Sequence, residues 1–142
     1  MRTSFAKSTL LKLKKYKQSV TLLDVGCNLD IFVKEARVIG FDAYGIDPCY
    51  QAIEEGKRIF NLKKYLIGWE LTTINFPENS FDVVTLIRCL EHINDLNFVL
   101  KKVHFILKED SIILIEASNF DSFWRKLLSQ RRYVLSPKQH FW

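Results

Sequence analysis

Five short apolar runs, separated by stretches with helical periodicity, most constrain what this chain can fold into. The runs are rich in β-branched or aromatic residues, as β-strands are, and they lie at 21–25, 43–46, 65–67, 83–87 and 112–116. Strands that alternate with helices form parallel βαβ units. The sequence therefore predicts an α/β protein with a doubly wound sheet of five parallel strands and helices on both faces.

Two of the intervening helices have recognisable beginnings. Residues 96–107 keep one apolar stripe at helical spacing, and Asn94 or Asp95 is the predicted N-cap. Pro48 follows the second run and suits the first turn of a helix that continues to Phe60. A further helix is expected before the first strand, because a rough apolar stripe lies between its lysines: Phe5, Leu10, Leu13, Tyr16 and Val20.

The length of 142 residues predicts a single domain, and 48% hydrophobic residues are enough for a sizeable core. We divide it into a basic N-terminal helix (1–20), the sheet core (21–119) and a basic amphipathic segment (120–142). No apolar run approaches the roughly 20 residues that span a bilayer, and the N-terminus lacks the features of a signal peptide. The chain is expected to be cytoplasmic, without a transmembrane segment.

The net charge of +5 is unevenly distributed. Residues 1–23 and 121–142 together hold eleven Lys and Arg and one acid, whereas 24–120 hold ten bases and fifteen acids. Basic ends can bind an anionic partner, but they are more often solvated faces of helices. No recognition motif accompanies them, so nucleic-acid binding is not expected.

The three cysteines, Cys27, Cys49 and Cys89, match neither a zinc pair nor a disulfide framework. Each follows a predicted strand, so their thiols could meet at one edge of the sheet and bind a soft metal. The simpler interpretation is that they are small residues in tight turns. No metal site is predicted.

The turn after the first strand, LLDVGCNLDIF, is the candidate ligand site. In open parallel sheets, ligands bind beyond the carboxyl ends of the strands. Gly26 occupies the first such turn, and Asp47 stands 21 residues later at the end of the second strand, where a carboxylate can bind ribose hydroxyls. The pair alone is a weak signal, because an ordinary turn and a helix cap would look the same.

The order of the later segments is more diagnostic. LLDVGCNLDIF, YGIDP, SFDVV with LEH, and SIILIEASNF together resemble the class I S-adenosylmethionine-dependent methyltransferases. The resemblance covers 21–119, about 70% of the chain. It implies a Rossmann-like fold, S-adenosylmethionine as cofactor and S-adenosylhomocysteine as product. Complete domains of that family have a seven-stranded sheet whose last two strands are antiparallel, and this chain lacks the sequence for them.

The resemblance also assigns roles to residues. Gly26 and the backbone of Cys27 are placed beside the methionine part of the cofactor, with Asp24 steadying the turn. Asp47 is placed at the ribose, and Trp69 and Glu70 near the adenine, unless Trp69 simply fills the core. The implied cofactor-binding residues are Asp24, Gly26, Cys27, Asn28, Asp47, Pro48, Trp69, Glu70 and Arg88.

The segment after the fourth strand holds the candidate catalytic residue. Arg88, Cys89, Glu91 and His92 are expected at the mouth of the site. Histidine is the side chain best suited to proton transfer near neutral pH, so His92 is the candidate general base. Methyl transfer depends mainly on positioning, however, and a structural role for His92 remains the simpler alternative.

Two replaced glycines distinguish this turn from the family pattern. Asn28 tolerates positive φ, whereas Asp30 would repel the carboxylate of the cofactor and lower its affinity. We expect a methyltransferase domain, truncated or degenerate, acting on a small-molecule or glycan-like acceptor.

The alternatives are an interaction module and a nucleotide-dependent dehydrogenase. The module would dock, or form a homodimer, through the open edge of the fifth strand. The dehydrogenase is less favoured, because GCNLDI keeps only the first glycine of G-x-G-x-x-G.

Overall fold

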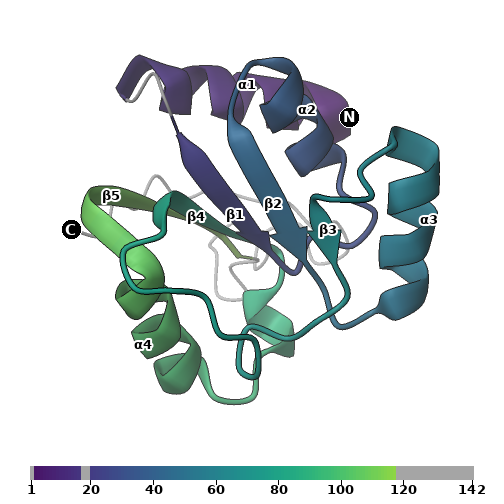
Figure 1. Cartoon of the computed structure of the whole chain (residues 1–142). Coiled ribbons are helices and arrows are strands. Elements are labelled where there is room, and N and C mark those ends of the chain that lie inside the picture. Colours follow the sequence, from purple (N-terminus) through teal and green to yellow (C-terminus); the bar gives the residue numbers. More distant parts are fainter. Residues whose placement is uncertain (1, 17–19, 118–142) are drawn as a thin grey trace, which may run out of the picture.

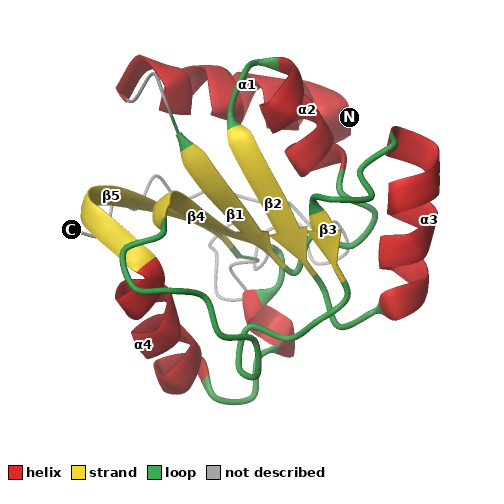
Figure 2. Ribbon diagram, viewed as in Figure 1, coloured by secondary structure: helices red, strands yellow, loops and turns green. Residues whose placement is uncertain are grey.

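A single five-stranded sheet forms the centre of the computed structural model, which describes residues 2–16 and 20–117 (Figures 1 and 2). The sheet order is β3-β2-β1-β4-β5, and every neighbouring pair is parallel. The predicted fold class is confirmed. Within the described residues the sheet lacks the last two strands of the seven-stranded family sheet. Its strands are β1 (Thr21–Val25), β2 (Asp42–Ile46), β3 (Leu66–Ile67), β4 (Phe81–Ile87) and β5 (Leu107–Glu116).

Helices cover both faces of this sheet because alternate residues of each strand point to opposite sides. Leu22 of β1 packs with α1, α2 and α3, whereas its neighbour Leu23 packs with α4 on the other face. Both side chains have no exposed surface, so the central strand is buried on both sides. The helices are α1 (Arg2–Tyr16), α2 (Ile31–Val38), α3 (Tyr50–Phe60), α4 (Leu96–Ile106) and the short 3₁₀ helix η1 (Leu90–His92).

The helix predictions are correct in place and differ in detail. Asp95 caps α4, because its carboxylate accepts a hydrogen bond of 2.9 Å from the Phe98 amide. The helix after Asp47 begins at Tyr50, two residues beyond Pro48. In α1 the buried residues are Ala6, Leu10 and Leu13, and the expected contribution of Tyr16 is wrong, since this residue is 71% exposed.

The start of β5 was also misplaced by the sequence pattern. The fifth apolar run predicted a strand from residue 112, but β5 already begins at Leu107, opposite Phe81, with the polar stretch LKEDS. The pairing register shifts between Phe81 and Val83, and Asp110 has a φ of 55°. The polar residues therefore form an irregular first part of the strand, in the manner of a β-bulge.

Asp82 joins the starts of three strands. Its carboxylate oxygen Oδ2 accepts hydrogen bonds of 2.9 Å from the Thr21 amide and from Lys108 Nζ. Asp82 therefore connects the beginning of β4 to those of β1 and β5.

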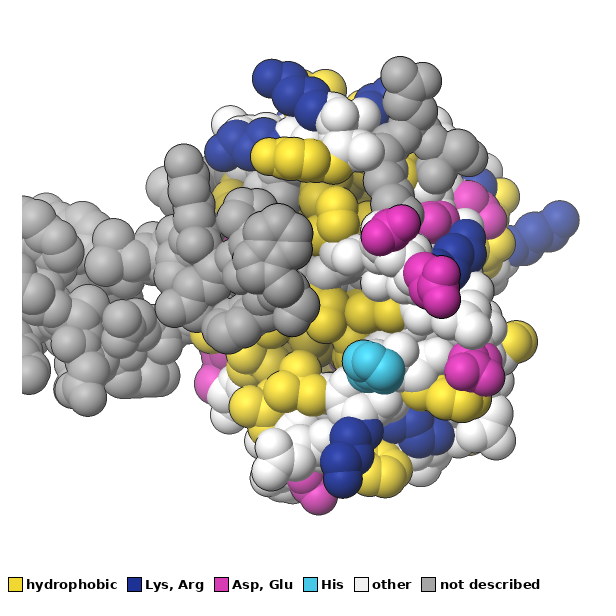
Figure 3. Space-filling model, turned by 90° about the vertical axis from the view of Figure 1, so that its left-hand side faces the viewer, with side chains coloured by type: hydrophobic (Ala, Val, Ile, Leu, Met, Phe, Trp, Pro, Cys, Tyr) yellow, Lys and Arg dark blue, Asp and Glu magenta, His cyan; other side chains and the backbone are white. Residues whose placement is uncertain are grey.

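β5 is the last strand of the described sheet. Figure 3 shows the side of the molecule on which this strand lies, and hydrophobic side chains gather there. Within β5 itself, Ile112, Ile113, Leu114 and Ile115 are partly exposed. The amphipathic segment predicted at 120–142 lies outside the described residues. Among 2–16 and 20–117, no helix has the length and apolar character needed to cross a membrane.

Candidate functional site

The turn from β1 into α2 is shaped by close backbone contact with its neighbours. The amides of Gly26 and Cys27 both donate to the Ile46 carbonyl, at 2.9 and 3.1 Å. Gly26 has a φ of +75°, and a Cβ added there would lie 2.5 Å from the Cβ of Cys89. A side chain at this position would therefore be strained by its backbone and would clash with the segment after β4. Glycine is required here by two independent constraints.

Asp47 connects the end of β2 to this turn. Its two carboxylate oxygens accept hydrogen bonds of 2.8 Å, one from the Asn28 amide and the other from the Cys49 amide. Asn28 has a φ of 54°, a conformation that asparagine tolerates better than most residues. The carboxylate thus holds the turn and the beginning of the α3 segment together. The residue is 9% exposed, so it is largely buried.

Asp30 occupies the place of another family glycine, and its side chain is buried. It is 2% exposed, has a φ of 59° and caps α2 by accepting a hydrogen bond from the Val33 amide. Its other oxygen, Oδ2, has no hydrogen-bond partner in the described part of the chain. This oxygen lies over Gly45 of β2, where an added Cβ would come within 2.1 Å of it. The missing side chain of Gly45 therefore makes the space that Asp30 fills.

Burial also changes the protonation of the carboxyls behind the turn. Burial and, to a smaller extent, the nearby charge of Asp47 raise the pKa of Asp24 to about 7, although a hydrogen bond from the Thr85 hydroxyl lowers it. Burial likewise raises the pKa of Asp30 well above its usual range, with the charge of Asp24 adding to the effect. Both shifts favour the neutral acid. Burial and the neighbouring carboxyls also raise the pKa of the Cys27 thiol, so this cysteine is no thiolate nucleophile.

A pocket of about 560 Å³ opens beside the turn, at the carboxyl ends of the strands. Its volume lies within the usual range of small-molecule sites, roughly 300–1,000 Å³. The structure brings together in its lining most of the residues singled out from the sequence: Gly26, Asn28, Asp47, Pro48, Trp69, Glu70, Arg88, Cys89 and His92.

Three of the expected residues do not line this pocket. Asp24 and Cys27 are buried behind the turn, with exposed fractions of 4% and 8%. Asp24 binds the Thr85 hydroxyl on β4, so its support of the turn acts through the sheet. Glu91 is exposed and lies outside the lining. The side chains of Trp69 and His92 are exposed at the pocket, so the interpretation of Trp69 as core is wrong.

Sequence reasoning missed another part of the lining. Leu71 and Thr72 follow β3, and Ile93, Asn94 and Asp95 connect η1 to α4. Asn94 and Asp95 were predicted only as candidate N-caps of the following helix. Their position in the pocket lining was therefore not predicted. The segment after β3 has no regular pattern that would have placed it there.

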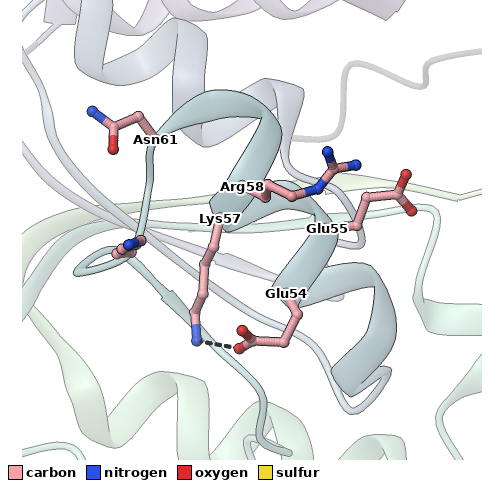
Figure 4. A pocket seen from close by; sticks show the side chains of 6 residues that line it. Glu54, Glu55, Lys57, Arg58 and Asn61 are labelled. Carbon is pink, nitrogen blue, oxygen red and sulfur yellow. Dashed lines mark hydrogen bonds and ion pairs between the residues drawn. The ribbon is translucent and has the colours of Figure 1, made fainter.

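A second hollow lies along α3, and Figure 4 shows its charged lining. Lys57 Nζ is 2.8 Å from Glu54 Oε1, so two of its opposite charges already pair with each other. The hollow holds no buried polar group directed at a ligand, and we assign it no function. In the described part of the chain, no three His, Cys, Asp or Glu side chains are grouped so that they could hold a metal ion.

Known proteins resemble this chain in sequence and in fold. The sequence pattern of the methyltransferase domain family matches residues 1–142. A ubiquinone biosynthesis O-methyltransferase of Pelagibacter ubique (strain HTCC1062) is 26% identical over 127 residues, which cover 84% of this chain and 53% of that protein. The chain thus spans about half the length of this relative.

Solved structures share the fold at lower identity. A SAM-dependent methyltransferase from Archaeoglobus fulgidus superposes with a TM-score of 0.73 at 20% identity, over 95% of this chain and 63% of that one. The plantazolicin methyltransferase BpumL, solved in complex with a triazolic desmethylPZN analog and SAH, gives 0.74 at 22% identity, over 91% and 52%. The chain therefore belongs to the methyltransferase domain family, within the class I S-adenosylmethionine-dependent methyltransferases.

Proposed function

We propose that this chain binds S-adenosylmethionine and transfers its methyl group to a small-molecule acceptor, releasing S-adenosylhomocysteine. The observation that carries the proposal is the single pocket lining shared by Gly26, Asp47 and His92, which come from three different strand ends. Such convergence at the carboxyl edge of an open parallel sheet is the usual arrangement of a ligand site. The O-methyltransferase relative favours an oxygen acceptor. The proposal includes glycan-like metabolites among the small-molecule acceptors. It also includes a cytoplasmic location for the chain.

The residues of the turn fit the cofactor. Gly26 brings the backbone of the turn to the pocket lining, and Asp47 would hold the ribose while keeping its bonds to the Asn28 and Cys49 amides. Trp69 is 53% exposed at the pocket and would stack on the adenine, with Glu70 beside it. Asp30 is buried, and its raised pKa favours the neutral acid, which lessens its repulsion of the carboxylate of the cofactor. The affinity loss expected from Asp30 should therefore be small.

The chemistry requires little from the protein beyond placement. The sulfonium of S-adenosylmethionine supplies an activated methyl group, so the pocket must align the acceptor and exclude water. His92 is exposed at the pocket and its side chain is held by no hydrogen bond in the described residues. It would accept the proton of a hydroxyl acceptor.

Isothermal titration with S-adenosylmethionine and S-adenosylhomocysteine tests the proposal. We expect micromolar binding that weakens strongly in Asp47→Ala and less in Asp47→Asn, which keeps an acceptor oxygen. Glu35→Gln is the matched control, because this buried acid lies in α2 and pairs with Lys34 away from the pocket. Absence of binding at millimolar ligand by a folded protein would refute cofactor use.

The interaction module is not favoured by the comparisons, whose named relatives are methyltransferases. It predicts a homodimer through the outer edge of β5, and this homodimer stays a prediction. Sedimentation velocity tests it, because an edge-pairing module must dimerise at concentrations where the cofactor-binding domain alone remains monomeric.

A further inference from the structure

Arg88 is the one permanent cation among the described residues that line the pocket. The ionisable acids in the same lining are Asp47, Glu70 and Asp95. An anionic group that enters the pocket would be repelled by these three carboxylates and attracted only by the guanidinium of Arg88. The charges of the site therefore distinguish the Arg88 end from the rest.

The guanidinium is held in place by β5. Arg88 Nε lies 2.8 Å from Glu116 Oε1, and the Arg88 amide donates to the Glu116 carbonyl at 2.7 Å. Glu116 is 2% exposed, so its position is fixed by the surrounding protein. Arg88 itself has a φ of 56°, an uncommon conformation for a residue with a side chain. Backbone and side chain are thus both constrained by the same partner.

The terminal nitrogens of Arg88 remain available. Only Nε is hydrogen-bonded within the described residues, and the side chain is 48% exposed at the pocket. A guanidinium with a fixed Nε and two free terminal nitrogens can donate two parallel hydrogen bonds to a carboxylate or a phosphate. The arrangement is that of an oriented anion receptor.

The position of the pair along the sheet assigns it to the acceptor. Under the proposed function, the cofactor extends from the β1 turn through Asp47 after β2 to Trp69 after β3. Arg88 follows β4 and Glu116 ends β5, on the other side of β1 in the order β3-β2-β1-β4-β5. An anion at Arg88 therefore lies beyond the sulfonium end of the cofactor, where the methyl acceptor must approach.

We propose that Arg88 is a specificity residue, positioned by Glu116, that binds an anionic group of the methyl acceptor. The chemical class of acceptor is a small molecule bearing a carboxylate or a phosphate. This inference rests on the proposed function, because it places the acceptor relative to the cofactor. It adds a property of the acceptor that the methyltransferase fold alone leaves open.

Ligand-observed NMR and calorimetry on the full chain saturated with S-adenosylhomocysteine test it, with benzoate, inorganic phosphate and benzamide as probes. We expect benzoate and phosphate to bind in the millimolar range and the uncharged benzamide to bind much more weakly. Arg88→Gln should weaken benzoate about tenfold or more, as expected for the loss of charged hydrogen bonds. Arg58→Gln, which makes the same change at the second hollow, should leave benzoate binding unchanged.

Two further variants separate positioning from charge. Glu116→Gln keeps an oxygen for Arg88 Nε and should retain most benzoate binding, whereas Glu116→Ala should lose it without affecting benzamide. A purely structural role of Glu116 would weaken both probes equally. Arg88→Lys should bind benzoate with intermediate affinity, because lysine keeps the charge but not the planar pair of donors. Thermal unfolding confirms which variants are folded.

The cofactor itself carries a carboxylate, so the two sources must be distinguished. S-adenosylhomocysteine and 5′-methylthioadenosine, which lacks the amino-acid part, are titrated into wild type and Arg88→Gln. If Arg88→Gln weakens only S-adenosylhomocysteine and leaves benzoate unchanged, Arg88 binds the cofactor and the inference is overturned. Anion binding that is absent or independent of Arg88 also overturns it. Failure of both S-adenosylhomocysteine and 5′-methylthioadenosine to bind a folded protein refutes the proposed function instead, whatever benzoate does.

Discussion

Gly45→Ala should destabilise the protein strongly, although alanine is a small and common strand residue. The added Cβ would lie 2.1 Å from Asp30 Oδ2 and 2.8 Å from Cys27 Sγ, both much closer than van der Waals contact. Overpacking of this kind costs about 1–3 kcal/mol. If Asp30 rotates away, α2 loses its capping oxygen, which costs about 1 kcal/mol more. We expect a total loss of roughly 2–4 kcal/mol in the free energy of unfolding.

Asp30→Gly should rescue most of this loss. The substitution removes the oxygen that clashes, and glycine adopts the φ of 59° found at Asp30 without strain. It also removes Oδ2, which has no partner in the described part of the chain. In a wild-type background the lost cap and these gains should nearly cancel. The double variant should therefore be more stable than Gly45→Ala alone, with Cys27 Sγ accounting for the remaining cost.

Urea unfolding of the four proteins in this cycle measures the coupling. We expect a coupling free energy of about 1–3 kcal/mol, well above the roughly 0.5 kcal/mol within which independent sites add. Gly40→Ala is the matched control: its φ is +95° and its added Cβ meets nothing within 4 Å, so its cost should be the same with or without Asp30. Additive effects of Gly45→Ala and Asp30→Gly would show that Asp30 does not lie over β2.

Three other predictions follow from the site. Asp24 has a folded pKa of about 7, above the value near 4 of an unfolded chain, so its contribution to stability is present below pH 4 and is lost as the pH rises to 7. Asp24→Asn should reduce this loss by up to about 4 kcal/mol at pH 8. Urea unfolding at pH 5 and 8 measures it, and an equal change in the free energy of unfolding of wild type and Asp24→Asn would contradict the prediction. Gly26→Ala should abolish S-adenosylhomocysteine binding in calorimetry and lower the melting temperature, because its Cβ would lie 2.5 Å from Cys89; undiminished affinity would show that the turn relaxes freely. Thr85→Val removes the hydroxyl that donates to Asp24 and should raise the pKa of that carboxyl further, which a decline of stability that continues above pH 7 would reveal.

The strands and the main site residues were predictable because local patterns determine them. The β-branched runs coincide with buried strands, and the parallel pairing of the strands follows from their alternation with helices. Gly26 and Asp47 meet at one pocket because the carboxyl ends of neighbouring parallel strands share an edge. His92 and Arg88 were placed there by the same topological reasoning.

The direction of the Asp30 side chain was not predictable from its own segment. A capping aspartate at the end of a turn can face solvent or core, and here the choice depends on space above Gly45, a residue of the next strand. The start of β5 was not predicted for a similar reason, since Leu107 begins the strand by pairing with Phe81 of β4 and the polar residues follow it within the strand. Contacts between distant segments decide both features.

The central position of β1 in the sheet also affects how the chain folds while it is being synthesised on the ribosome. Among the strands of the described sheet β1 is synthesised first, but its partners arrive at different times: β2 follows within one βαβ step, whereas Thr21 and its partner Asp82 are separated by 61 residues. Until β4 emerges, one apolar edge of the nascent sheet has no strand beside it, and such edges are prone to aggregation. The growing chain therefore has a period of vulnerability to misassembly, during which a chaperone that shields open strand edges would increase its yield.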